Sequence, residues 1–148
     1  MKAILSTFVL FVALLSHSFA FTTTLPADSA THKLTVTISG LTQRTGKLYV
    51  GLATDDKSLM GKSAITQTID VPATGDATLT FADLKPGKYA VRLYQDLNDN
   101  KQMDFSGQMP TEPFGFSNVT MLMGPPSFDQ CAFVLDGDKA VSVSVIEM

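Results

Sequence analysis

Alternation of apolar and polar residues with a period of two is the feature of this sequence that most restricts its fold. In residues 33–39, Leu34, Val36 and Ile38 alternate with Thr and Ser side chains, and the same pattern returns further along the chain. Successive side chains of a strand point to opposite faces of a sheet, so each such stretch predicts a strand with one apolar face. Seven strands are expected, at residues 33–39, 48–52, 65–71, 77–81, 89–93, 131–135 and 140–146.

The expected strands are short, and turn-forming sequences separate them. Pro86 and Gly87 suit the two central positions of a tight turn, because proline fixes φ and glycine accepts a positive φ. Residues 33–148 show no stretch with the period of an amphipathic helix. Each strand has an apolar face that another sheet must cover, so we expect an all-β fold, a single seven-stranded antiparallel Greek-key β-sandwich with one long loop. A partly open barrel is the alternative that the strand pattern leaves open.

The first 20 residues have the composition of an export signal. Lys2 provides a positive charge, an apolar run follows, and Ser18 and Ala20 place small residues where a signal peptidase cleaves. The apolar run, about twelve residues, is too short to span a bilayer of roughly 30 Å, which argues against a retained anchor. We therefore expect a signal peptide at 1–20, a mobile leader at 21–32 and a β-sandwich domain at 33–148, in a periplasmic or secreted protein without a membrane span after cleavage.

Charge and the content of cysteine and histidine exclude several classes of function. The chain has 11 Lys and Arg against 14 Asp and Glu, a formal net charge of −3, and it has no basic face for nucleic-acid phosphates. Cys131 is the single cysteine, so no intrachain disulfide forms, and its apolar neighbours favour a buried thiol. His32 is the one histidine left after signal cleavage, which leaves a Ser-His-Asp triad or a zinc site without its ligands. We expect no enzyme activity.

Residues 96–130 are a stretch of about 35 residues with little strand pattern, and a loop of that length in a compact domain usually has a function. The loop begins with oxygen-bearing side chains at every second position, and a further acid follows. Calcium prefers six to eight hard oxygen ligands, which such a loop can provide. The candidate calcium ligands are Asp96, Asn98, Asn100, Gln102 through its carbonyl, Asp104 and, as the nearest unused carboxylate, Glu112.

This loop resembles the calcium loops of EF-hand and dockerin proteins, with two departures. Lys101 stands where glycine allows the sharp turn, and Gly107 stands where a bidentate Glu completes the shell. The alternative is that the Asp and Asn side chains only form successive turns, by accepting hydrogen bonds from nearby backbone N–H groups. Residues 96–112 contain four carboxylates against one lysine, however, and this excess of negative charge favours a bound cation.

Two other functions stay open for the same loop. Asp104 and Glu112 are a carboxylate pair of the kind that glycoside hydrolases use, which would make the protein a periplasmic or cell-surface carbohydrate hydrolase. Thioethers bind Cu(I), so the loop methionines are candidate copper ligands, unless Met-Leu-Met is a short strand with both sulfurs in the core. These methionines are Met103, Met109, Met121 and Met123. Our preferred interpretation is a non-catalytic binding or interaction module for an unknown protein or glycan ligand.

Several motifs occur in one order along most of the chain, namely Pro86-Gly87-Lys88-Tyr89, the 96–104 loop, Gly115-Phe116-Ser117-Asn118 and Gly124-Pro125-Pro126-Ser127-Phe128. In this order they resemble the bacterial family of domain of unknown function 2141, over about residues 34–145. The resemblance implies an exported bacterial protein with a prealbumin-like, or transthyretin-like, sandwich, and it implies no established activity. The family's loop has glycine at the position of Lys101.

Overall fold

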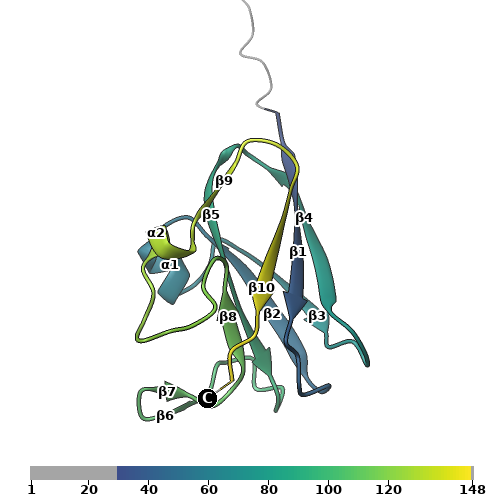
Figure 1. Cartoon of the computed structure of the whole chain (residues 1–148), viewed down its shortest axis with the longest axis vertical. Coiled ribbons are helices and arrows are strands. Elements are labelled where there is room, and N and C mark those ends of the chain that lie inside the picture. The colour runs from purple at the N-terminus through teal and green to yellow at the C-terminus, as the bar shows by residue number, and fades with distance from the viewer. Residues whose placement is uncertain (1–29, 148) are drawn as a thin grey trace, which may run out of the picture.

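The computed structural model describes residues 30–147, so the expected signal peptide and most of the expected leader lie outside the described residues. The described chain is mostly strand, with two short helices (Figure 1). Its elements are β1 (His32–Ser39), β2 (Lys47–Ala53), α1 (Asp56–Met60), β3 (Ile65–Asp70), β4 (Ala77–Leu84), β5 (Gly87–Asp96), β6 (Phe105–Ser106), β7 (Met109–Pro110), β8 (Phe114–Phe116), α2 (Phe128–Cys131), β9 (Phe133–Leu135) and β10 (Lys139–Ser144). The all-β expectation is confirmed.

β1 is the central strand of a three-stranded sheet with the order β10-β1-β4. It runs antiparallel to β4, with Val36 opposite Leu79, and parallel to β10, with Val36 opposite Val141. The expected wholly antiparallel arrangement is therefore wrong. A period of two shows which residues of a strand face the core, but a strand that runs in either direction buries the same alternate residues, so the pattern does not encode direction.

The second sheet has the order β3-β2-β5-β8, and β9 also pairs with β5. Its longest pairing joins β2 to β5, from Lys47 opposite Asp96 to Ala53 opposite Ala90. This register brings the end of β5, where the long loop begins, beside the start of β2. The expected count of seven strands is also wrong, because β6, β7 and β8 form within the 96–130 region.

Alternate residues of both sheets meet in one apolar core. The inward positions of the first sheet include Leu34, Val36 and Ile38, and those of the second include Leu48 and Val50, all fully buried. Other large members are Leu52, Leu79, Phe81, Val91, Leu93, Leu135 and Val143. Full burial of one such side chain stabilises the fold by about 1.5–3 kcal/mol, so the shared core holds the two sheets together. Two sheets around one core are consistent with the expected sandwich.

Two short helices, which the helical-period analysis does not predict, lie together beside β5 in Figure 1. The backbone N–H of Phe128 in α2 donates to Oδ1 of Asp56 in α1 at 2.7 Å and so joins the helices. A second apolar cluster around Leu59, Phe128 and Cys131 packs on Ala53 and Ala90, which occupy the outward positions of β2 and β5. The helices therefore cover part of the outer face of the second sheet. No helix within residues 30–147 has the length and apolar character needed to cross a membrane.

The ends of these helices carry sequence signals that periodicity does not detect. Asp55 caps α1 through Oδ1, which accepts from the backbone N–H of Ser58 at 2.7 Å. Gln130 Oε1 accepts from the backbone N–H of Ser127 at 2.8 Å at the start of α2. A capping residue followed three positions later by a reciprocal partner marks a helix start even where the helix has only one turn. α2 also explains why the expected strand at 131–135 begins only at Phe133.

Candidate functional site

The acidic loop, residues 96–112, begins where β5 ends. Asp96 is 0% exposed, and its carboxylate oxygens accept from the backbone N–H groups of Asn98 at 3.3 Å and Lys101 at 2.8 Å. Gly46, next to the start of β2, packs against this residue, because a Cβ at Gly46 would lie 2.0 Å from the Asp96 carbonyl oxygen. The first turn of the loop is therefore wrapped around one buried carboxylate.

Two asparagines continue the loop and bring it to Asp104. Oδ1 of Asn98 accepts from the backbone N–H of Asn100 at 3.1 Å, and Oδ1 of Asn100 accepts from that of Gln102 at 2.8 Å. Their side-chain amides donate to the two carboxylate oxygens of Asp104, at 2.6 Å from Asn98 and 2.8 Å from Asn100. The turns expected from the alternating oxygens are present, and they gather the side chains around Asp104.

The β6–β7 hairpin then reverses the chain and brings Glu112 back beside the first residues of the acidic loop. This side chain is 5% exposed, and its oxygens accept from the backbone N–H groups of Leu97 at 2.8 Å and Asp104 at 3.2 Å. A backbone hydrogen bond of 2.9 Å from Thr111 to the Asp104 carbonyl closes the return. The residue proposed from sequence as the missing carboxylate thus lies in the same hydrogen-bonded loop as Asp96 and Asp104.

The four carboxylates of this loop make no ion pair with any described residue. The ion pairs within residues 30–147 are Lys47–Asp70 and Lys88–Asp129. Buried carboxylates are costly unless a partner offsets the loss of water, and at Asp96 and Glu112 the recorded partners are neutral backbone N–H groups. The loop is therefore a concentration of negative charge that its own described contacts leave unneutralised.

The negative charge of the loop also affects Tyr94 on β5, the strand at whose end the loop begins. The pKa of Tyr94 is raised, first by burial, then by Tyr49, Asp96 and Glu112.

Residues 30–147 contain no group of three or more His, Cys, Asp or Glu side chains arranged to hold a metal ion. The oxygens that the loop brings together are instead a mixture of carboxylate and amide groups, which are both hard donors of the kind that calcium prefers.

Lys101 takes the backbone conformation that glycine would take at this position of a calcium loop. Its φ is 63°, and that of Asp99 is 60°, both in the left-handed region. Side chains with a Cβ are disfavoured there. Lys101 therefore keeps the left-handed backbone that glycine favours at this position and introduces local strain. Gln102 is exposed and follows this turn directly.

The carboxylates suggested for acid-base chemistry already hold several hydrogen bonds. Both oxygens of Asp104 accept from asparagine amides, and both oxygens of Glu112 accept from backbone N–H groups. A general acid or base must lie within hydrogen-bond reach of a bound substrate, and these oxygens already accept from donors of the loop itself. Part of the acceptor capacity of both carboxylates is therefore used within the loop.

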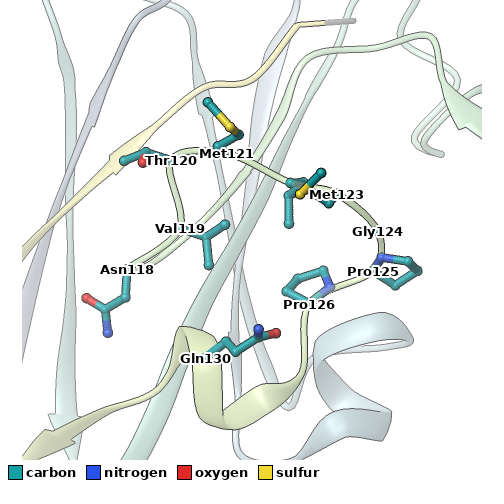
Figure 2. A pocket seen from close by; sticks show the side chains of 10 residues that line it. Asn118, Val119, Thr120, Met121, Met123, Gly124, Pro125, Pro126 and Gln130 are labelled. Atoms are coloured by element: carbon teal, nitrogen blue, oxygen red, sulfur yellow. The ribbon is translucent and has the colours of Figure 1, made fainter.

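The loop methionines belong to two different segments. Met109 lies in β7, whereas Met121 and Met123 lie in the 118–126 segment, at 81% and 102% exposure. Figure 2 shows both of the latter side chains on that segment, away from Gln130 of α2, at a hollow of about 630 Å³. The alternative that both sulfurs belong to the core is wrong. Neither thioether has water-excluding cover, so the segment is a weak candidate for Cu(I).

Cys131 is fully buried, as the sequence predicts, although at the end of α2. Burial raises the pKa of its thiol from 9.0 to about 11. A reactive cysteine needs a lowered pKa, so this thiol serves packing.

Sequence reasoning missed one further group of polar residues, which lies on the outer face of the second sheet. Tyr49 and Tyr94 stack there with ring centroids 5.0 Å apart. They line a hollow together with Lys62, Arg92 and Lys101. The available signal was the outward position of each strand residue, since Tyr49 and Gly51 alternate with the buried Leu48, Val50 and Leu52.

Comparison with known proteins gives one family. A family model described as "Uncharacterized protein conserved in bacteria (DUF2141)" matches residues 36–144, which include both sheets and the acidic loop. No curated protein and no solved structure matches the chain.

Proposed function

Since this chain belongs to the DUF2141 family of bacterial proteins, we propose that it is an exported, non-catalytic binding module whose acidic loop is organised by calcium. The proposal includes a prealbumin-like Greek-key arrangement of its two sheets and a place in the periplasm or outside the cell, for which the first 20 residues are the support. The observation that carries it is the pair of buried carboxylates, Asp96 and Glu112, whose recorded hydrogen bonds come from neutral N–H groups.

Calcium would act here as a structural ion. Its candidate ligands are the side-chain oxygens of Asp96, Asn98, Asn100, Asp104 and Glu112, with the carbonyl of Gln102. A divalent cation offsets the repulsion among the carboxylates and holds the return from β7 against the end of β5. The bound loop would then present a fixed surface to a protein or glycan ligand, which is the role of a rigid loop in a binding module.

Thermal unfolding of the mature chain, residues 21–148, tests the calcium proposal. A ligand that binds only the folded state stabilises it by about 2.7 kcal/mol at 100 times its Kd, so the Tm should rise in calcium relative to chelator. Magnesium should raise the Tm less, because it requires a tighter octahedral shell. Equal Tm values in calcium and in chelator would falsify the proposal.

Two substitutions in the loop separate ion binding from general charge effects. Asp104→Asn removes a carboxylate that accepts both asparagine amides, and it should abolish most of the calcium-dependent rise in Tm. Asp99→Asn makes the same charge change at an exposed residue of the same loop, and it should leave the rise in place. Equal losses in the two variants would mean that calcium only screens surface charge.

The carbohydrate hydrolase is the second candidate, because Asp104 and Glu112 lie within one hydrogen-bonded loop. A screen of glycan hydrolysis by the mature chain examines it. Turnover that disappears in both Asp104→Asn and Glu112→Gln, in folded protein, would place the hydrolase first. We expect no turnover.

A further inference from the structure

A cationic hollow lies on the outer face of the second sheet, beside the acidic loop. It has a volume of about 330 Å³ and includes the side chains of Lys62, Arg92 and Lys101. No Asp or Glu is among the residues that line it. The three cations therefore face the hollow without an acid in its lining, although the carboxylates of the acidic loop lie behind Tyr94 and Lys101.

The register of β2 and β5 produces the hollow. Tyr49 lies opposite Tyr94, and two residues further along, on the same face, Gly51 lies opposite Arg92. The tyrosine rings stack with an interplanar angle of 6°, so they form a wall of the hollow. Ser63 packs directly over Gly51 beside this wall, because a Cβ at Gly51 would lie 2.4 Å from Ser63 Oγ.

Arg92 lines the hollow and has no ionic partner within residues 30–147. Its guanidinium donates to the carbonyl of Gly61, and the two ion pairs of the described chain do not include it. Burial lowers the pKa of Arg92 below its usual value. A half-buried cation that holds only a neutral carbonyl has lost part of its hydration, and an anion that entered the hollow would restore a charged partner.

Lys101 reaches the hollow from the acidic loop. Its left-handed φ of 63° would suit glycine better, yet the position carries a long cationic side chain that lines the hollow. Strained residues often occur at functional sites, where the surrounding structure holds them. Lys62 and Lys101 are both exposed, so a ligand can approach these residues from solvent.

We propose that this hollow binds an anionic saccharide, with the acidic group on Arg92, Lys62 and Lys101 and the sugar hydroxyls on the tyrosine and serine hydroxyl groups. The charge of the lining selects an anion. The volume is at the lower end of small-molecule sites, so the hollow would hold one or two units of a short oligosaccharide rather than a long polymer. The inference deepens the proposed function by naming its ligand class, and it rests on that function only in treating the chain as a binding module.

Isothermal titration of the mature chain with trigalacturonate tests the proposal. We expect saturable binding of trigalacturonate, weakened by added salt, and no binding of the neutral trisaccharide maltotriose. A sulfated disaccharide identifies the acidic group: tighter binding than trigalacturonate assigns the site to sulfated sugars and still supports it. Equal affinities for trigalacturonate and maltotriose, or no binding of any acidic saccharide at millimolar concentration, would overturn the proposal.

Matched lysine variants locate the binding. Lys62→Gln should weaken trigalacturonate binding about tenfold, the effect of one lost charge-assisted hydrogen bond. Lys85→Gln, at an exposed lysine outside the hollow, should leave the affinity unchanged. Equal losses in both variants would show nonspecific attraction and overturn the site. Titration with trigalacturonate in the presence of chelator distinguishes the two proposals. Arg92 and Lys62 lie outside the acidic loop, so they should still bind trigalacturonate if the calcium proposal fails.

Discussion

Among single residues, Lys101 shows most directly how local strain and ligand binding compete. A left-handed φ costs a residue with a Cβ about 1–2 kcal/mol, and glycine avoids this cost while gaining freedom in the unfolded chain. Lys101→Gly should therefore raise the free energy of unfolding by about 0.5–1 kcal/mol, measured by urea denaturation. The same variant should bind trigalacturonate more weakly. As a control, Gln102→Gly, at a residue without a positive φ, should lower stability.

Cys131 gives a prediction about pH, because burial raises its pKa from 9.0 to about 11. The folded state favours the neutral thiol, so this contribution to stability is complete below pH 9 and is lost as the pH rises towards 11. At pH 8, Cys131→Ala should have a lower free energy of unfolding than the unchanged protein, measured by urea denaturation. Between pH 8 and pH 11, the free energy of unfolding of the variant should fall by less than that of the unchanged protein. Parallel losses in the two proteins would contradict the assignment.

At the scale of elements, the contact between the start of β2 and the end of β5 depends on Gly46. Gly46→Ala forces a Cβ to within 2.0 Å of the Asp96 carbonyl oxygen at a φ of +79°. Gly75→Ala imposes a similar φ, +73°, with nothing within 4 Å of the added Cβ. Gly75→Ala should cost about 1 kcal/mol, and Gly46→Ala should cost clearly more, because backbone must move. Equal costs in urea denaturation would show that the close approach contributes nothing.

The elements also show what a sequence can and cannot reveal. Strands such as β1 and β2 were predictable, since alternate residues like Val36 and Val50 must reach one core. The direction of β10 was not, because no local property of residues 139–144 records which strand they join or which way they run. α1 is too short for a helical period, although the pairing of Asp55 with Ser58 was a usable sign of its start.

The two candidate sites also differ in whether the sequence alone could predict them. The acidic loop was predictable, because Asp96 to Asp104 are close in sequence and their spacing alone gathers the oxygens. The cationic hollow joins Tyr49, Lys62 and Arg92 from separate elements, and only the register of β2 with β5 brings them together. A search for local motifs does not detect a site whose residues are brought together only by the register of two paired strands.

For the whole molecule, Lys101 links the two proposed sites, since it lies between candidate calcium ligands and lines the hollow. Calcium that orders the loop should fix this lysine at the hollow and tighten trigalacturonate binding. Linkage then requires trigalacturonate to tighten calcium binding by the same factor. Titration of each ligand with and without the other measures both factors. Lys101→Gly should abolish the coupling between calcium and trigalacturonate. Lys62→Gln should weaken saccharide binding but preserve the coupling, because Lys62 is outside the loop. Coupling that survives in Lys101→Gly would mean that calcium acts on the saccharide by another route.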